Sequence, residues 1–181
     1  QQADMDFASK NDITENEYYE MIKNKTAVLI GCSFMFGGIV AEANDLNTDL
    51  LYKIGLNLGM AFQLEDDLLD CFGDQEKFGK KIGGDIIEKK KTLLYLFTNS
   101  KLNSEKKLEF ENIFNSSEIA KSEKINSIKS FYETSGASEY LKNKVRVYFN
   151  EAEILIDKLE LDNDTKRRLN QFSKTLLNRK I

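Results

Sequence analysis

Residues 51–72 read LYKIGLNLGMAFQLEDDLLDCF, and this stretch decides the fold. Hydrophobic side chains recur in it at steps of three and four residues, which is the spacing of one face of an α-helix. The members of that face are Leu51, Ile54, Leu58, Ala61, Leu68 and Phe72, with Glu65 as a polar member. Gly55 and Gly59 lie four residues apart, so another helix can approach closely there. Gly73 is predicted to end the helix.

The segment before this helix contains a helix start and a long uncharged stretch. Thr14 is followed three residues later by Glu17, the pattern of a capping box, which predicts a helix through Lys25. That helix either continues into residues 26–41 or kinks before them. These sixteen residues carry no charge, and a membrane span needs about 20, so we expect a buried core helix. The polar residues 44–49 are expected to form a turn.

The rest of the chain also has the pattern of helices. A glycine-rich loop is expected at 73–84, followed by a helix that resumes near Asp85 and runs through Phe97. Further helices are expected near 104–115, 118–135, 138–160 and 164–179, with Gly136 as a C-terminal stop and Asp162 as an N-terminal cap. The 181 residues include no proline, which favours long uninterrupted helices. We therefore predict an all-α fold in which residues 1–181 form a single domain.

Composition excludes several classes of function. The chain has no histidine, which rules out Ser-His-Asp and Cys-His catalysis and zinc sites that contain histidine. The two cysteines, Cys32 and Cys71, cannot form a four-cysteine zinc site, and we interpret them as reduced core thiols of a cytoplasmic protein. The net charge of −4 argues against nucleic-acid binding, and no transmembrane segment is predicted.

Charge is sorted sharply on the two sides of Gly73. Residues 62–76 contain six acidic side chains and no basic one, whereas residues 77–91 contain six lysines beside Asp85 and Glu88. A Mg2+–diphosphate site needs this combination, because carboxylates hold the metal, the metal holds phosphate oxygens and ammonium groups neutralise the remaining charge. Lysine-rich loops are also common as plain solvated surface, and that interpretation stays open.

Asp66, Asp67 and Asp70 form the densest part of the acidic stretch. Asp66 and Asp70 share one helix face at roughly 6 Å, where two carboxylates repel by about 3 kcal/mol at an effective dielectric constant of about 20. The C-terminal end of a helix also disfavours anions, so a bound cation would offset both costs. Such a string of aspartates also occurs by chance in helical proteins, and alone it does not establish a metal site.

This acidic stretch resembles the second aspartate-rich motif of the trans-type polyprenyl (isoprenyl diphosphate) synthases, over residues 62–70, FQLEDDLLD. The following Gly79-Lys80 and residues 83–85, GGD, resemble the family's Gly-Lys and Gly-x-Asp loop. Residues 85–92, DIIEKKKT, resemble the segment with a diphosphate-binding lysine five residues after the aspartate, here Lys90.

Two upstream motifs agree with this resemblance. Lys25-Thr26-Ala27 resembles the Lys-Thr pair on the preceding helix, and Gln1-x-x-Asp4 resembles the end of a Gly-Gln-x-x-Asp motif. The five motifs occur in the family's order and cover about residues 1–97. Lys89 and Lys91 depart from the usual family residues, although neither change looks disabling.

The resemblance implies an isoprenoid-synthase type of helical bundle and a prenyltransferase reaction. An allylic diphosphate would ionise with the help of Mg2+, and isopentenyl diphosphate would attack the cation, giving a linear trans-polyprenyl diphosphate. The implied metal residues are Asp66 as a direct ligand and Asp67, Asp70 and Asp85, which would hold metal-bound waters or orient Lys80.

The resemblance also implies residues that bind the substrates. Lys25, Lys80 and Lys90 would contact the diphosphate, Thr26 and Gln63 would place oxygen dipoles near the cation, and Phe62 would line the isopentenyl site. Each has an ordinary alternative: core packing for Phe62, and a hydrogen bond between helices for Thr26 and Gln63. Cys71 adjoins Asp70, and we expect it to be a packing residue.

The family's first aspartate-rich motif is not found in this chain. In the family it lies upstream of the position of Gln1, so we expect a C-terminal portion of a synthase that is inactive alone. A homodimer is expected from the resemblance. A non-catalytic regulatory subunit of a heteromeric prenyl synthase stays as the alternative, although such subunits often lose the aspartates. A class I terpene cyclase is disfavoured because its second metal motif is not found, and a purely structural bundle is disfavoured by the ordered motifs.

Overall fold

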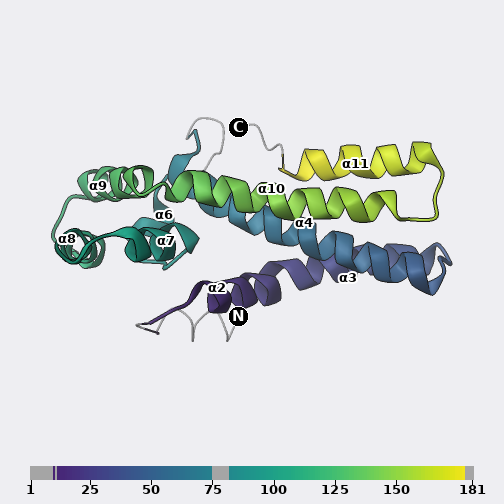
Figure 1. The fold of residues 1–181 in the computed structure, drawn as a ribbon, viewed down its shortest axis with the longest axis horizontal. Coiled ribbons are helices and arrows are strands. Elements are labelled where there is room, and N and C mark those ends of the chain that lie inside the picture. The colour runs from purple at the N-terminus through teal and green to yellow at the C-terminus, as the bar shows by residue number, and fades with distance from the viewer. Residues whose placement is uncertain (1–9, 11, 75–81, 178–181) are drawn as a thin grey trace. The chain divides into compact units, whose positions relative to one another are not determined.

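A computed structural model describes residues 10, 12–74 and 82–177. All regular elements in these ranges are helical (Figure 1), which confirms the predicted all-α class. In chain order they are α2 (Glu15–Ile22), the π-helical segment η1 (Lys23–Ala27), α3 (Val28–Val40), α4 (Asp45–Phe72), α6 (Gly84–Ile87), α7 (Leu93–Lys101), α8 (Ser104–Asn115), α9 (Lys121–Thr134), α10 (Ala137–Asp157) and α11 (Asn163–Leu177). Within the same ranges, every helix is too short or too polar to cross a lipid bilayer.

The described residues group into two compact units. The first unit holds those up to Tyr18 and those from Asp66 to Lys142, and the second holds those from Tyr19 to Glu65 and from Asn143 onward. The helices α2, α4 and α10 each contribute residues to both units. The single domain expected from the sequence stays a prediction.

Packing in the second unit depends on two glycines of α4. A Cβ atom added at Gly55 would lie 2.8 Å from the Cα of Gly31, and one added at Gly59 would lie 2.5 Å from the Cα of Ala27. Glycine is therefore required where α4 meets η1 and α3, and the close helix approach expected from Gly55 and Gly59 is confirmed. α4 also contributes to a hydrophobic cluster with α10 and the residues just after it: Leu50, Ile54, Leu58, Ala152, Ile156 and Leu159.

Aromatic side chains form the core of the first unit where α7, α8 and α9 meet. The ring centroid of Tyr95 lies 4.5 Å from that of Phe114 and 5.2 Å from that of Phe110, and Phe110 lies 5.3 Å from Phe131. Such contacts between rings fix the position of α7. The segment just before α7 carries the predicted site residue Lys90.

Several helix ends follow the predicted signals. The Thr14 N–H donates to Glu17 Oε2 at 2.9 Å and the Glu17 N–H donates to the Thr14 hydroxyl at 3.2 Å, which confirms the capping box at the start of α2. α4 ends directly before Gly73. Gly136 follows α9 with a φ of +80°, and the Asp162 carboxylate accepts two backbone N–H groups at the start of α11.

The turn expected at residues 44–49 is wrong, because α4 already begins at Asp45. The Asn44 side chain accepts the N–H of Asn47 at 2.8 Å and so caps the helix. The polar residues here lie in the first turn of a helix, and the Asn44 side chain accepts one of its free N–H groups, so no separate turn forms.

The helix expected from Asp85 through Phe97 is interrupted. α6 lasts only four residues, and α7 starts at Leu93. Lys89, between the two helices, has a φ of +57°, a left-handed conformation that ends a helix.

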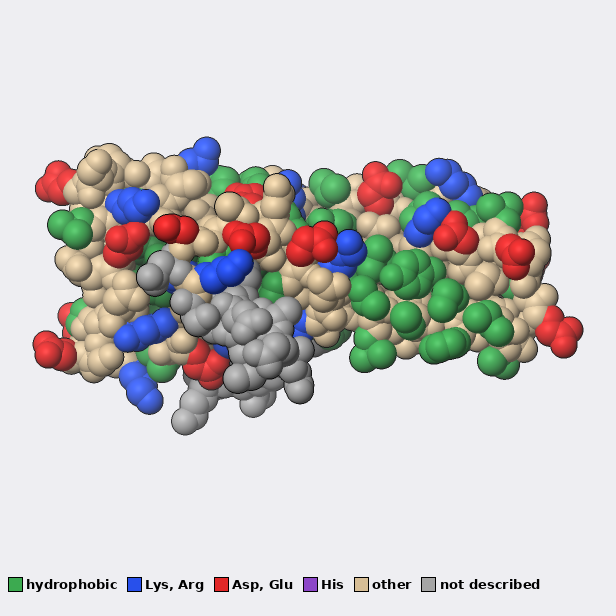
Figure 2. All heavy atoms as spheres, turned by 90° about the horizontal axis from the view of Figure 1, so that it is seen from below, with side chains coloured by type: hydrophobic (Ala, Val, Ile, Leu, Met, Phe, Trp, Pro, Cys, Tyr) green, Lys and Arg blue, Asp and Glu red, His purple; other side chains and the backbone are tan. Residues whose placement is uncertain are grey.

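The uncharged stretch forms the last two residues of η1 and all of α3, but one side of α3 is exposed in this chain. Leu29, Phe36, Ile39 and Val40 are 71%, 59%, 51% and 84% exposed. Figure 2 shows hydrophobic side chains gathered on one face of the molecule. The expectation of a buried core helix is wrong for this side of α3, because the described residues leave these side chains in solvent.

Candidate functional site

The predicted site residues fall into two groups, one in each compact unit. The second unit holds Lys25 and Thr26 on η1 and Phe62 and Gln63 on α4. The first unit holds the residues at the end of α4, in α6 and in the segment before α7: Asp66, Asp67, Asp70, Asp85 and Lys90. Lys80 lies outside the described residues, as do Gln1, Asp4 and Gly79.

In the second unit, the π-helical segment η1 carries Lys25 and Thr26. The Thr26 hydroxyl donates to Gln63 Oε1 at 2.8 Å. A π-helical turn between α-helical runs is frequent at functional sites, since it takes side chains out of the regular register. The fold thus brings Thr26 and Gln63 together. Their hydrogen bond fits both the implied role near a cation and an ordinary contact between helices.

In the first unit, Asp70 accepts hydrogen bonds from backbone N–H groups at the start of α6. The Asp85 N–H donates to Asp70 Oδ2 at 2.9 Å, and the Gly83 N–H donates to the Asp70 carbonyl at 2.6 Å. Gly83 has a φ of +79°, and a Cβ atom at Gly84 would lie 3.0 Å from Asp70 Oδ1. The two glycines therefore let the backbone adopt a left-handed turn and bring α6 against the acidic end of α4.

Asp85 also holds Lys90. The Lys90 Nζ lies 2.8 Å from Asp85 Oδ1 and 2.9 Å from Glu88 Oε2. Burial lowers the pKa of the Lys90 ammonium, but the hydrogen bonds to Asp85 and Glu88 outweigh burial and raise that pKa above its ordinary value. The group therefore stays charged, and it is near enough to Asp70 to act on its pKa.

Negative charge is crowded around Asp70. The pKa of its carboxyl is raised to about 6, chiefly by burial. The hydrogen bond from the Asp85 N–H and the charge of Lys90 lower this pKa, whereas the negative charges of Asp85 and Asp66 raise it. Carboxylates near one another form the oxygen donor set that Mg2+ prefers.

Within the described ranges, no group of three acidic or thiol side chains is arranged to hold a metal by itself. Mg2+ usually takes one or two protein carboxylates and keeps several waters. An ion held by Asp66, Asp70 and Asp85 would therefore need water and phosphate oxygens to complete its coordination, and a metal site at these residues stays a prediction.

Asp67 is placed differently from its neighbours. It is 6% exposed and accepts a hydrogen bond from the hydroxyl of Tyr18 on α2. No pattern in the sequence predicted Tyr18, because 49 residues separate it from Asp67 and such a partner leaves no local signal.

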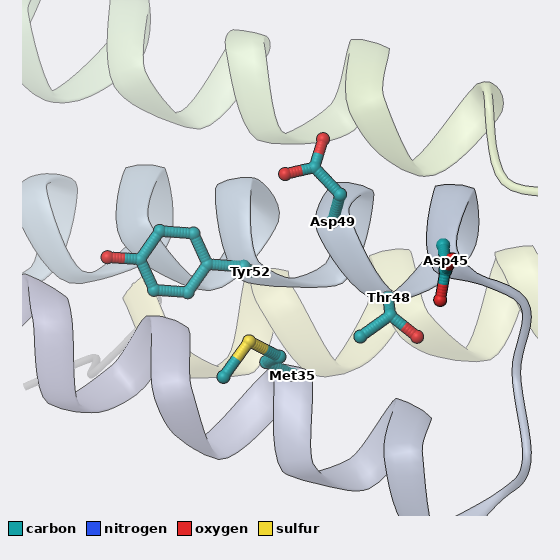
Figure 3. Close-up of a pocket in the computed structure, with 5 residues that line it drawn as sticks. All are labelled: Met35, Asp45, Thr48, Asp49 and Tyr52. Carbon is teal, nitrogen blue, oxygen red and sulfur yellow. The ribbon is translucent and has the colours of Figure 1, made fainter.

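A shallow hollow in the second unit is lined by other residues: Met35 of α3 and Asp45, Thr48, Asp49 and Tyr52 of α4. Figure 3 shows Met35 pointing from α3 towards these α4 side chains. Asp49 is paired with Lys53 at 2.6 Å. Since no predicted site residue lines the hollow, it is not a candidate for the site.

Comparison with known proteins agrees with the geometry. The family model described as Polyprenyl synthetase matches residues 1–133. The geranylgeranyl diphosphate synthase of Saccharolobus solfataricus is 47% identical over 107 residues, which cover 59% of this chain and 32% of the relative. A crystal structure of a geranylgeranyl pyrophosphate synthase matches with a TM-score of 0.91 at 40% identity, covering 100% of this chain and 56% of that chain.

The polyprenyl synthase of Caulobacter crescentus, solved in complex with calcium and isoprenyl diphosphate, matches with a TM-score of 0.88 at 26% identity, covering 99% of this chain and 54% of that one. The chain spans about a third of the length of its Saccharolobus relative and about half of these solved chains. The predicted isoprenoid-synthase type of helical fold is confirmed for that part. The chain belongs to the polyprenyl synthetase family.

Proposed function

We propose that the protein containing this chain is a prenyltransferase that condenses isopentenyl diphosphate with an allylic diphosphate to give a linear trans-polyprenyl diphosphate. The observation that carries this proposal is the arrangement around Asp70. The charges of Asp66 and Asp85 both act on the Asp70 carboxyl, which accepts the Asp85 N–H, and the charged Lys90 is tied to Asp85. Such an arrangement can neutralise a diphosphate through a divalent cation and an ammonium group together.

Mg2+ is the cofactor that we propose for this site. Asp66 would be its protein ligand, and Asp70 and Asp85 would accept hydrogen bonds from its waters. When bound, the ion would stabilise the negative charge that develops on the departing diphosphate. The Caulobacter relative was solved with calcium and isoprenyl diphosphate, which is a comparable pairing of divalent cation and diphosphate.

The other site residues act on the substrates directly in this proposal. Lys90, oriented by Asp85, would donate to phosphate oxygens. Lys25 and Lys80 are proposed as diphosphate-binding residues on the resemblance alone. The Thr26 hydroxyl donates its hydrogen bond to Gln63 Oε1, so the lone pairs of the Thr26 oxygen can turn towards a cationic carbon. The half-buried Phe62 lines the isopentenyl site. A homodimer is proposed on the resemblance alone, and a cytoplasmic location on the interpretation of Cys32 and Cys71 as reduced thiols.

A non-catalytic regulatory subunit of a heteromeric synthase is the alternative. A subunit that binds no metal would have no use for a half-buried carboxyl at Asp70, whose pKa burial raises and the charges of Asp85 and Asp66 raise further. The retained aspartates and Lys90 therefore favour the enzyme.

Two matched variants of the full-length protein test the proposal. Asp66→Asn keeps the size of the proposed ligand and removes its charge, and we expect it to lower turnover by at least about a hundredfold. Asp49→Asn makes the same change on the same helix and breaks only an exposed ion pair with Lys53, so turnover should persist. Full turnover by Asp66→Asn would contradict the metal assignment. A parent protein that binds diphosphate without turning over would favour the regulatory subunit.

A further inference from the structure

Asp67 and Tyr18 form a buried pair in the first unit. Tyr18 is 1% exposed, Asp67 is 6% exposed, and the phenol hydroxyl donates to Asp67 Oδ2. Among the described residues, Asp67 and Lys124 are the charged side chains that are buried. A buried carboxylate is costly unless it is hydrogen-bonded, so the hydroxyl of Tyr18 offsets part of that cost.

The burial of Asp67 makes it a poor ligand for Mg2+. The ion keeps several waters, and a carboxylate with almost no exposed surface that already accepts a hydrogen bond from a phenol hydroxyl has little room for a hydrated ion. Asp66 and Asp70, by contrast, are only half-buried. The three aspartates of the motif thus have two different environments.

A fixed side chain at Asp67 also fixes its neighbours on α4. Asp66 precedes it by one residue and Asp70 follows it by three, all on one regular helix that ends at Phe72. Side-chain directions on an α-helix follow from the rotation of the helix about its axis. An anchor at one position therefore sets the directions of the other two carboxylates.

We propose that Tyr18 is a positioning residue, whose hydroxyl holds Asp67 as an anchor and so directs Asp66 and Asp70 towards the metal. The inference rests on the proposed function, because it concerns the Mg2+ site. It replaces the role expected for Asp67 from the resemblance, that of holding metal-bound water, with a role inside the protein. It also adds Tyr18, on α2, to the residues on which the site depends.

Thermal unfolding of the full-length protein tests this role without measuring activity. Mg2+ is titrated in the presence of inorganic pyrophosphate, and the rise in Tm gives an apparent Mg2+ dissociation constant. Tyr18→Phe keeps the ring and removes the hydroxyl, and we expect Mg2+ to bind about tenfold more weakly, which is the scale of loss when groups that orient metal ligands are removed.

The Asp67→Asn variant distinguishes a role of Asp67 as an anchor from a role as a metal ligand. The amide oxygen of asparagine can still accept a hydrogen bond from the Tyr18 hydroxyl. We therefore expect the apparent Mg2+ dissociation constant to change by no more than about threefold, which is less than the change expected when a metal ligand or a group that orients it is removed. Asp66→Asn is expected to lose the Mg2+ response altogether.

Tyr140→Phe is the matched control for a purely structural effect. It removes a hydroxyl that donates to Glu15 Oε2 at 2.9 Å in the same unit. It should lower Tm and leave the Mg2+ constant unchanged.

Three results would overturn the proposal. Tyr18→Phe with the Mg2+ constant of the parent would show that the hydroxyl does not position the site. Asp67→Asn without a Mg2+ response, like Asp66→Asn, would make Asp67 a ligand, and this arm decides the matter even if Tyr18→Phe does not fold. A parent protein without any Mg2+ response would mean that the proposed function itself has failed, and with it the site that Tyr18 would serve.

Discussion

Replacement of Gly59 by alanine is expected to destabilise the second unit and to disturb the Thr26–Gln63 pair. The new Cβ atom would lie 2.5 Å from the Cα of Ala27, 3.0 Å from its Cβ and 3.3 Å from its carbonyl oxygen. Because carbon atoms normally approach to about 3.5–4.0 Å, α4 and η1 would have to separate by about 1 Å. The nearest atom belongs to the backbone, so no side chain can rotate away to relieve the contact.

The size of the effect follows from two opposing contributions. Overpacking costs about 1–3 kcal/mol, and the higher helix propensity of alanine offsets at most about 1 kcal/mol of that cost. We expect a net loss of about 1–2 kcal/mol in the free energy of unfolding, which lowers Tm by roughly 2–8 °C in a chain of 181 residues. Separation at Ala27 also stretches the 2.8 Å hydrogen bond from its neighbour Thr26 to Gln63.

Gly37→Ala on α3 is the matched control. A Cβ atom there meets no described atom within 4 Å, so only the propensity gain of about 0.5–1 kcal/mol should remain and Tm should rise. Thermal unfolding followed by circular dichroism measures both variants. A Gly59→Ala protein as stable as the parent would refute the close packing of α4 against η1.

Two further predictions concern single side chains. The pKa of Glu17 is lowered from 4.5 to about 2, chiefly by the Thr14 N–H and next by Lys10. The contribution of Glu17 to the free energy of unfolding is therefore present above pH 4.5 and lost as the pH falls towards 2. Glu17→Gln should remove this part of the pH dependence in an acid unfolding experiment. The same pH dependence in the variant and the parent would contradict the prediction. Burial raises the pKa of the Cys71 thiol to about 12, so an alkylating reagent at about pH 8 should modify Cys71 only after unfolding, as located by mass spectrometry; rapid labelling of the native protein would contradict its burial.

Local signals in the sequence predicted what depends on neighbouring residues. The capping box of Thr14 and Glu17 and the stop at Gly73 need only a few adjacent residues, and both occur where expected. The close helix approach at Gly59 followed from its spacing of four residues from Gly55 on a clear helix. Polar residues at the start of a helix, as after Asn44, resemble those of a turn, because the same side chains hydrogen-bond to nearby backbone groups in both structures.

The remaining features depend on contacts that the sequence does not mark. A run of lysines gives no sign that Lys89 takes a left-handed conformation. The apolar composition of α3 predicted a buried helix, but composition does not identify the segment that would pack against its exposed side. The partner of Asp67 is a tyrosine 49 residues away, and only the fold brings the two together.

The proposed prenyltransferase activity is tested most directly with the full-length protein. It is incubated with Mg2+, labelled isopentenyl diphosphate and allylic diphosphates of increasing length, and the products are sized. We predict a discrete linear prenyl diphosphate whose formation stops when the metal is chelated. No elongation with any of these allylic diphosphates, while diphosphate binding is intact, would contradict the proposal and favour a regulatory subunit.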